Sequence, residues 1–301
     1  MTRSTTHSAQ WHQRPQLGIA LYLLNVVMLA TLGAVVKELS ARYPLGELLA
    51  FRFAIAALLF TLALRAAGGI PALATRRPGL HAVRTASGIV SLGLLFVAIA
   101  HIPLAETSVL INTAPFFVVI FSIPLLGETI GFRRWAAVLL GFCGVLLIAQ
   151  PGGLAIGTGL LAAIGSALFA ALVTITVRML SRSETTATIG FYYNACGALV
   201  YTLSAWLGDW ALPATDDYGL FLVFGILAAA QQWAVNHAPR FAEASLLAPL
   251  QYLSLVFSAV LGFVFWGEIP AQPTWVGAAL IVTGGLFILA RKRHKDTSTC
   301  T

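Results

Sequence analysis

The sequence has few charged residues. Asp, Glu, Lys and Arg make up 10% of the 301 residues, whereas 58% are hydrophobic. A soluble domain normally carries about 25% charged residues. The apolar residues also form long blocks, without the alternation with polar residues that half-exposed helices and strands show. Such blocks are typical of segments surrounded by lipid or by other apolar helices, so the composition argues against a soluble globular domain.

Cysteine is also scarce. Cys143 and Cys196 lie within apolar blocks and Cys300 lies near the end of the chain, which gives neither a disulfide framework nor a metal-ligand spacing. Catalytic groupings of His, Asp, Glu, Ser or Cys and phosphate-binding motifs are not found either. We therefore predict no catalytic residues, no metal site and no cofactor, and keep a membrane-embedded enzyme only as a remote alternative.

The apolar blocks are long enough to cross a membrane, which takes about 20 residues in a helix. Backbone groups have no water partner in lipid, so each span is predicted to be helical. The first block is too long for the core of a signal peptide and is predicted to be a retained helix. We predict ten spans: 17–36, 45–66, 82–101, 104–126, 134–150, 157–178, 187–207, 218–237, 243–266 and 274–290.

The basic residues predict the orientation of these spans. With the N-terminus in the cytoplasm, only Lys37, Arg42 and Arg52 of the 18 basic residues fall outside the cytoplasmic tails and connections. This is the positive-inside pattern. We therefore expect a multi-pass protein of the cell (inner) membrane with both termini cytoplasmic and lipid around it. The net charge of +7 is explained by orientation, and no nucleic-acid partner is expected.

A set of short motifs occurs twice along the chain. The first copy holds Ala105-Glu106-Thr107-Ser108, Gly127-Glu128, Trp135 and Gly144, and the second holds Ala242-Glu243-Ala244-Ser245, Gly267-Glu268, Trp275 and Gly284. The last three pairs are offset by 140 residues. An odd number of helices in each copy places the two copies in opposite orientations. Such inverted repeats are typical of secondary transporters, whose substrate site lies near the midplane between the halves.

The domain organisation follows from this repeat. We predict an all-α membrane protein of two inverted five-helix repeats: a cytoplasmic N-terminal tail over 1–16, a first repeat over 17–150, a second over 151–290 and a basic cytoplasmic tail over 291–301.

These motifs, with Pro115, Ala248-Pro249 and Gln251-Tyr252, resemble those of the drug/metabolite transporter superfamily, specifically its EamA-type ten-helix members. The resemblance implies a central cavity lined by helices one to four and six to nine, with helices five and ten behind it. It also implies a function close to that of amino-acid and metabolite exporters, although importers share the same motifs.

Polar residues inside a membrane are costly, which makes them candidates for substrate contact. Amides both donate and accept hydrogen bonds, and aromatic rings hold apolar or cationic groups. Membrane Asn and Gln residues also bridge helices, so the bridging alternative stays open. The predicted cavity residues are Asn25, Asn112, Tyr193, Gln232, Trp233, Gln251 and Tyr252.

Charged residues are rare within the predicted spans and gather at their ends. Arg52 lies in the second span, and we expect it to pair with Glu47 or Glu38, with a substrate carboxylate as the alternative. The acidic residues lie at span ends, in connections or in tails, so strong ion coupling is not predicted. The recurring Glu106, Glu128, Glu243 and Glu268 are expected to cap helices or to pair with arginine.

Together these features predict a secondary transporter that exports small polar metabolites by alternating access, with amino acids or related compounds as its substrates. The alternative is an importer of a nucleoside-like or vitamin-like metabolite, in which Trp233 and Tyr252 stack on a flat ring. The sequence leaves the oligomeric state open.

Overall fold

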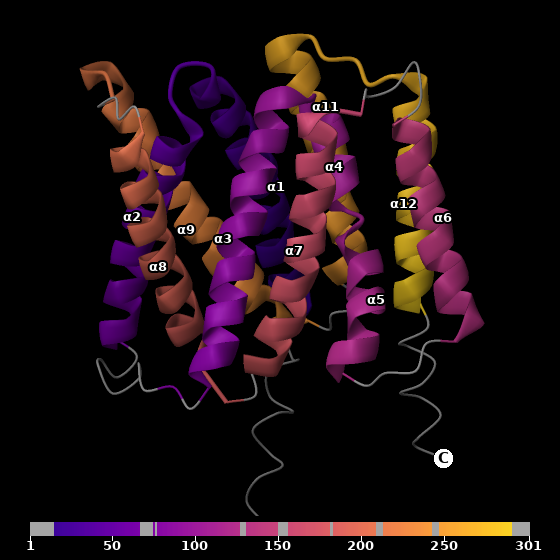
Figure 1. Cartoon of the computed structure of the whole chain (residues 1–301), viewed down its shortest axis with the longest axis horizontal. Helices are drawn as coiled ribbons and strands as arrows, with labels where there is room; N and C mark the ends of the chain where they lie inside the picture. The colour runs from indigo at the N-terminus through magenta and orange to yellow at the C-terminus, as the bar shows by residue number, and fades with distance from the viewer. Residues whose placement is uncertain are drawn as a thin grey trace, which may run out of the picture.

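The computed structural model describes residues 15–66, 75, 77–126, 131–149, 156–180, 183–208, 213–242 and 247–290. All regular secondary structure within these ranges is helical. Figure 1 shows the long helices standing side by side as a bundle. Glu128, Glu243, residues 1–14 of the predicted N-terminal tail and the predicted C-terminal tail lie outside the described residues, whereas Pro15 and Gln16 begin α1.

The helices follow one another along the chain with short connections. The first half contains α1 (Pro15–Ser40), α2 (Leu45–Ala66), α3 (Pro78–His101), α4 (Leu104–Ile111), α5 (Ala114–Leu126) and α6 (Phe132–Ile148). The second half contains α7 (Thr158–Leu180), α8 (Thr186–Leu207), η3 (Thr215–Asp217), α9 (Tyr218–Phe241), η4 (Ala248–Tyr252), α11 (Leu253–Trp266) and α12 (Gln272–Ala290).

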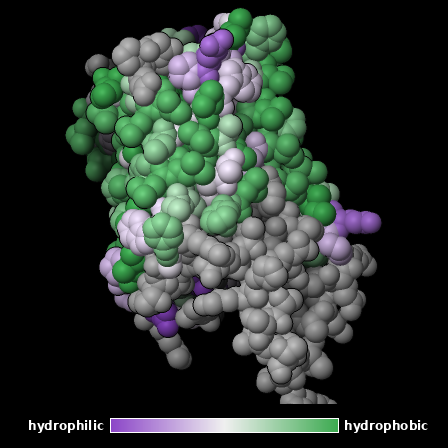
Figure 2. Space-filling view, turned by 90° about the vertical axis from the view of Figure 1, so that its right-hand side faces the viewer, coloured by the Kyte–Doolittle hydropathy of each residue, from purple (hydrophilic) through white to green (hydrophobic). Residues whose placement is uncertain are grey.

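Several of these helices are suited to cross a membrane. Six segments among the described residues are long and apolar enough by length and composition, and Trp135–Ile148 and Leu250–Trp266 are shorter apolar helices. Figure 2 shows hydrophobic residues covering the middle of one face, with hydrophilic residues gathered towards its upper and lower edges. An apolar band between polar edges is the surface that a bilayer requires. The protein is therefore a multi-pass membrane protein.

One predicted span is interrupted. The sequence predicts a single helix over 104–126, but the structure has two, α4 and α5, separated at Asn112 and Thr113. The reason is Pro115, which has no backbone N–H to donate to the carbonyl of Ile111 and so prevents a continuous helix. The side chains of Asn112 and Thr113 instead donate to the carbonyls of Ser108 and Leu110 at 2.7 Å and 2.6 Å.

A similar interruption occurs in the second half. The span predicted over 243–266 is described only from residue 247, and it opens with the 3₁₀ turn η4 before α11 begins at Leu253. Pro249 lies in this turn. Each half therefore contains a discontinuous helix beside a proline, an arrangement that transporters use to expose backbone and polar groups within the membrane.

The two halves pack against each other helix by helix. The closest pairs are α3 with α7, α2 with α8, α6 with α12 and α1 with α9. Figure 1 shows α6 beside α12 and α8 in front of α2. Ser91 of α3 and Ser166 of α7 each donate a side-chain hydrogen bond to the other's backbone carbonyl, at 2.9 Å and 2.8 Å. Small residues permit this close approach of two membrane helices.

These pairs run antiparallel. On α2 and α8, Phe53 lies against Gly197 and Phe60 against Gly190, so the numbering rises on one helix as it falls on the other.

The pair formed by α6 and α12 has the same orientation and an even closer approach. A Cβ atom on Gly144 would lie 2.7 Å from the carbonyl oxygen of Gly277, and a Cβ on Gly277 would lie 2.6 Å from that of Gly144. Further along, a Cβ on Gly284 would lie 2.8 Å from the carbonyl of Ala137. Glycine is required at these crossings because a side chain there would collide with backbone.

The connection between α1 and α2 is held to the start of α9. The Tyr43 hydroxyl donates to Asp217 at 2.6 Å, and Arg42 forms an ion pair with the same carboxylate at 3.1 Å. The hydrogen bond to Asp217 raises the pKa of the Tyr43 hydroxyl, because the proton is held between the two oxygens. The contact joins the two halves at one end of the bundle.

Candidate functional site

A cavity of about 150 Å³ lies between helices of both halves. Helices α1, α2, α3 and α4 of the first half and α9, η4 and α11 of the second supply its walls. Among the residues with described side chains, none of those lining the cavity comes from α6 or α12, in agreement with the expectation that these two helices lie behind the cavity. The expected contributions of α7 and α8 are not found among the lining residues.

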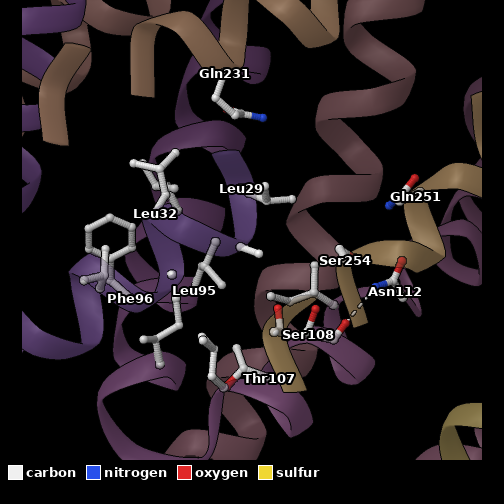
Figure 3. Close-up of a pocket in the computed structure, with 18 of the residues that line it drawn as sticks. Leu29, Leu32, Leu95, Phe96, Thr107, Ser108, Asn112, Gln231, Gln251 and Ser254 are labelled. Atoms are coloured by element: carbon white, nitrogen blue, oxygen red, sulfur yellow. Dashed lines mark hydrogen bonds between the residues drawn. The ribbon is translucent and has the colours of Figure 1, made fainter. Parts of the chain in front are cut away.

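One side of the cavity is apolar. Figure 3 shows Leu32, Leu95 and Phe96 along this side, contributed by α1 and α3. Phe224 of α9 also lines the cavity, and its ring centroid lies 6.1 Å from that of Phe96. This wall suits an apolar or aromatic part of a ligand.

Polar groups gather on another side of the cavity, at the two interrupted helices. Figure 3 shows Ser108, Asn112, Gln251 and Ser254 together there, while Gln231 points in from α9. The Nδ2 group of Asn112 donates a hydrogen bond to the Ser108 carbonyl. The buried Oδ1 atom of Asn112 has no hydrogen-bond partner among the described residues. An unpaired buried acceptor is costly and is available to a ligand donor.

Arg52 supplies a positive charge to this cavity. It is 7% exposed, and its guanidinium lies over the ring of Phe53 with Cζ 5.0 Å from the centroid. Its Nη1 atom is buried without a hydrogen-bond partner in the described part of the chain. A buried arginine needs a counter-charge or acceptors, and the cavity is where a ligand can provide them.

The sequence-based prediction for Arg52 was an ion pair with Glu47 or Glu38, and the described contacts speak against Glu38. Glu38 pairs with Arg42, four residues along α1, at 3.6 Å. No ion pair involves Arg52 within the described ranges. The physical reason for the absence of a pair with Glu38 is position: Arg52 lies inside α2 and faces the cavity, whereas Glu38 lies at the exposed end of α1.

Two of the predicted cavity residues line the cavity. These are Asn112, at the end of α4, and Gln251, in η4. Asn25 lies one step behind: its Oδ1 accepts a hydrogen bond from Gln231 at 2.6 Å, and Gln231 reaches the cavity. Similarly, the Tyr22 hydroxyl donates a hydrogen bond to Oε1 of Gln251 at 3.5 Å. These bonds position the two glutamine amides across the halves.

The other four predicted cavity residues lie elsewhere. Gln232 accepts from Asn194 at 3.2 Å and bridges α9 to α8. Tyr193 covers the Arg84 guanidinium at 4.0 Å. Trp233 is 49% exposed on the opposite face of α9, where it stacks on His237. Tyr252 lies against α12, where its hydroxyl occupies the space that a side chain on Gly285 would need.

Glu268 acts as a helix cap. Its carboxylate accepts the backbone N–H of Leu104, the first residue of α4, at 3.0 Å. The preceding Gly267 has φ 65° and ends α11, which turns the chain so that Glu268 can reach across. The prediction of a capping role is confirmed for Glu268, and its ionic partner is Lys37 rather than an arginine.

Comparison with known proteins identifies similar chains. The model of a family described as the EamA-like transporter family matches residues 16–150 and again residues 157–290. The pseudopaline exporter CntI of Pseudomonas aeruginosa (strain UCBPP-PA14) is 35% identical over 279 residues, which cover 92% of this chain and 97% of that protein.

More distant relatives carry other substrate names. A riboflavin transporter of Rhizobium johnstonii is 29% identical, covering 93% of this chain and 90% of its own. An S-adenosylmethionine uptake transporter of Rickettsia prowazekii is 25% identical, covering 93% and 95%. A solved crystal structure that is 23% identical superimposes with a TM-score of 0.63 over 92% of this chain and 97% of that chain, which shows a shared fold.

Proposed function

Because the chain belongs to the EamA-like transporter family, we propose that it is a secondary transporter that exports a small carboxylate-bearing metabolite by alternating access. Amino acids and related compounds are the first class to test. The observation that carries the proposal is the cavity, in which Arg52 and three amides face a space with one apolar side.

The cavity chemistry supports an amphiphilic ligand with a carboxylate. The Arg52 guanidinium can hold a carboxylate through paired N–H groups. The unpaired Oδ1 of Asn112 can accept a hydrogen bond from a ligand donor such as an ammonium or amide group. The leucines and Phe96 opposite them accept an apolar side chain. A zwitterion with an apolar part satisfies all three requirements at once.

The packing of the halves supports alternating access. Helices in equivalent positions of the two halves, such as α6 and α12, contact each other and run antiparallel. This is the relation expected between inverted five-helix repeats, in a chain of ten spans. Two such halves exchange conformations at similar energy, which gives inward-open and outward-open states.

The proposed direction of transport follows the exporter among the relatives, and the proposed topology follows the basic residues of the sequence. The exporter has the highest identity of the three relatives described above, at 35%. In the proposed topology both termini are cytoplasmic, and Lys37, Tyr43 and Glu268 lie on the outer side.

Counterflow in proteoliposomes that contain only this protein tests the proposal. Vesicles preloaded with one unlabelled compound from a panel of amino acids, their N-substituted derivatives, riboflavin and S-adenosylmethionine should accumulate the labelled form of a carboxylate-bearing member. Saturation and competition by other carboxylates are expected. The proposal would be rejected if no member of the panel gave saturable counterflow with protein whose thermal unfolding transition shows that it is folded.

A second candidate is import of a vitamin-like metabolite with a flat ring. Phe96 and Phe224 line the cavity with their ring planes inclined by 47°, and an aromatic ligand can pack against them. The riboflavin transporter among the relatives favours the same class. Riboflavin fluorescence inside intact cells distinguishes the two candidates: an importer raises it, whereas an exporter of carboxylates leaves it unchanged.

A further inference from the structure

A group of charged side chains lies at one end of the cavity. Lys37 at the end of α1 forms an ion pair with Glu268, which follows α11, and Glu268 also caps α4. Val36 and Leu104, next to Lys37 and at the start of α4, line the cavity. The ion pair therefore joins the two halves at the end of the cavity that is outermost in the proposed topology.

Glu106 lies beside this ion pair and is buried. It is 4% exposed, on the first turn of α4, between the cavity-lining residues Leu104 and Thr107. Its Oε1 atom accepts from the Thr274 hydroxyl at 3.3 Å. Its Oε2 atom is fully buried and has no hydrogen-bond partner in the described part of the chain. The sequence placed this carboxylate at a span end, and the structure shows that it is not exposed there.

The charges in this group do not balance when every member is ionised. Lys37 and Glu268 are charged groups near Glu106 at this end of the cavity. One cation faces two carboxylates, and Glu268 holds that cation directly. A buried carboxylate without a counter-ion is strongly disfavoured, and the positive end of a helix as short as α4 offsets only part of that cost. A bound proton on Glu106 removes the imbalance.

No titratable side chain within the described residues forms an ion pair with Glu106, including Arg52, which lines the same cavity from α2. His101, at the end of α3, is exposed and uses its Nδ1 atom on the carbonyl of Val97. In α12 no residue with a described side chain is titratable, and Arg178 of α7 lies in the last turn of that helix, at the opposite end of the bundle from Gly159 and its neighbour His101. The unpaired Oε2 atom of Glu106 is therefore the group that a proton would occupy.

We propose that Glu106 binds a proton when the Lys37–Glu268 end of the cavity is closed and releases it to water when that end opens. Opening hydrates the carboxylate, so the O–H bond of Glu106 breaks, the electron pair stays on Oε2 and the proton leaves to the outer solution. An outward-open state that has released substrate takes up an outer proton in order to close again. This inference rests on the proposed transport function, and it makes opening of the outer end of the cavity depend on the outer pH.

Access of a thiol reagent to the cavity tests the proposal without any substrate. Ser258 of α11 is buried and lines the cavity, so Ser258→Cys is the reporter, in a background of Cys143→Ala, Cys196→Ala and Cys300→Ala. Cells are treated with a membrane-impermeant methanethiosulfonate. A second chain with Glu38→Cys, whose side chain is 56% exposed at the same end, reports the orientation and the pH dependence of the reagent itself.

The closed state binds one more proton than the open state, so a rise in outer pH favours opening. The ratio of Ser258→Cys to Glu38→Cys labelling rates should increase with pH, by up to about tenfold per pH unit while Glu106 titrates. Glu106→Gln mimics the protonated acid, and it should keep the ratio low at every pH. Glu106→Asp should keep the pH dependence, as should Asp216→Asn, a change at an exposed carboxylate at the same end.

A ratio that does not vary with pH in the reporter chain, or that varies equally in the Glu106→Gln chain, would overturn the proposal. Neither result depends on finding a substrate. A pH-dependent ratio together with no counterflow would instead reject the transport function and leave the proton site in place.

Discussion

At the scale of single residues, a buried arginine is the most informative feature of the cavity. Insertion of an arginine into a membrane helix costs about 2.5–3.5 kcal/mol near the centre of the span. Arg52 has no ion pair among the described residues to offset this cost, and its Nη1 atom is buried without a partner. A residue kept at such a cost is best explained by a ligand that completes its contacts.

Arg52→Met tests this explanation. The change keeps an unbranched apolar side chain and removes the charge, so we expect transport of carboxylate-bearing substrates to fall by at least about tenfold, the loss of one charged hydrogen bond. The thermal transition in detergent should stay the same or rise. Arg52→Lys should retain part of the transport, because it keeps the charge without the paired N–H groups.

The matched control is Arg65→Met, at the exposed end of the same helix, which should transport as the unchanged protein does. Equal transport by the Arg52→Met and unchanged proteins would remove Arg52 from the site.

The polar residues show which part of a site sequence reasoning can find. Asn112 and Gln251 both lie close to a proline in an interrupted helix, and both line the cavity. Gln232 and Tyr193 lie in unbroken helices and contact neighbouring helices instead. A proline removes a backbone hydrogen bond and interrupts the helix. Polar side chains beside such a break can then face a cavity instead of a neighbouring helix. Proximity to a proline is therefore the signal that could have separated these two classes.

At the scale of helices, close glycine contacts fix the geometry of α6 and α12. Both Gly144 and Gly277 would place a Cβ atom under 3.0 Å from a backbone carbonyl of the partner helix. Backbone cannot move aside as the end of a flexible side chain can. The repeated Gly144 and Gly284 of the sequence both lie at this crossing, which gives the repeat motif a packing role.

Gly277→Ala should therefore separate α6 from α12 and destabilise the protein by about 1–3 kcal/mol, the usual cost of overpacking. A lower thermal transition in detergent is the expected measurement. Gly219→Ala is the matched control, since a Cβ at that position meets no atom within 4 Å at the start of α9. Its transition should not fall, because alanine favours a helix over glycine. Equal transitions for both variants would contradict the tight crossing.

At the scale of the whole molecule, composition and charge predicted an all-helical membrane protein with its main elements, and the structure confirms the all-helical membrane class over the described residues. The breaks at Asn112 and in η4 were not predicted as breaks in the spans, because a hydropathy pattern does not register a single interrupted turn. The hydropathy pattern also does not predict which helices pack against each other. Which face of α9 meets the cavity depends on contacts between residues such as Asn25 and Gln231, more than 200 positions apart.

The same pairing has a consequence for folding. The closest helix pairs, α3 with α7, α2 with α8, α6 with α12 and α1 with α9, all join one half of the chain to the other. A half expressed alone would lack the partner of nearly every helix, and its small-residue faces would meet lipid instead.

We therefore predict that a chain ending at residue 150 is degraded in cells when it is expressed alone and is stabilised by co-expression of a chain beginning at residue 151. Pulse–chase of the tagged first half measures this, with Gly277→Ala in the second half expected to weaken the rescue and Gly219→Ala to leave it intact. A first half that persists alone as long as it does with its partner would show that each repeat is stable by itself, and the interface between halves would then not be what holds α1 to α6 in place.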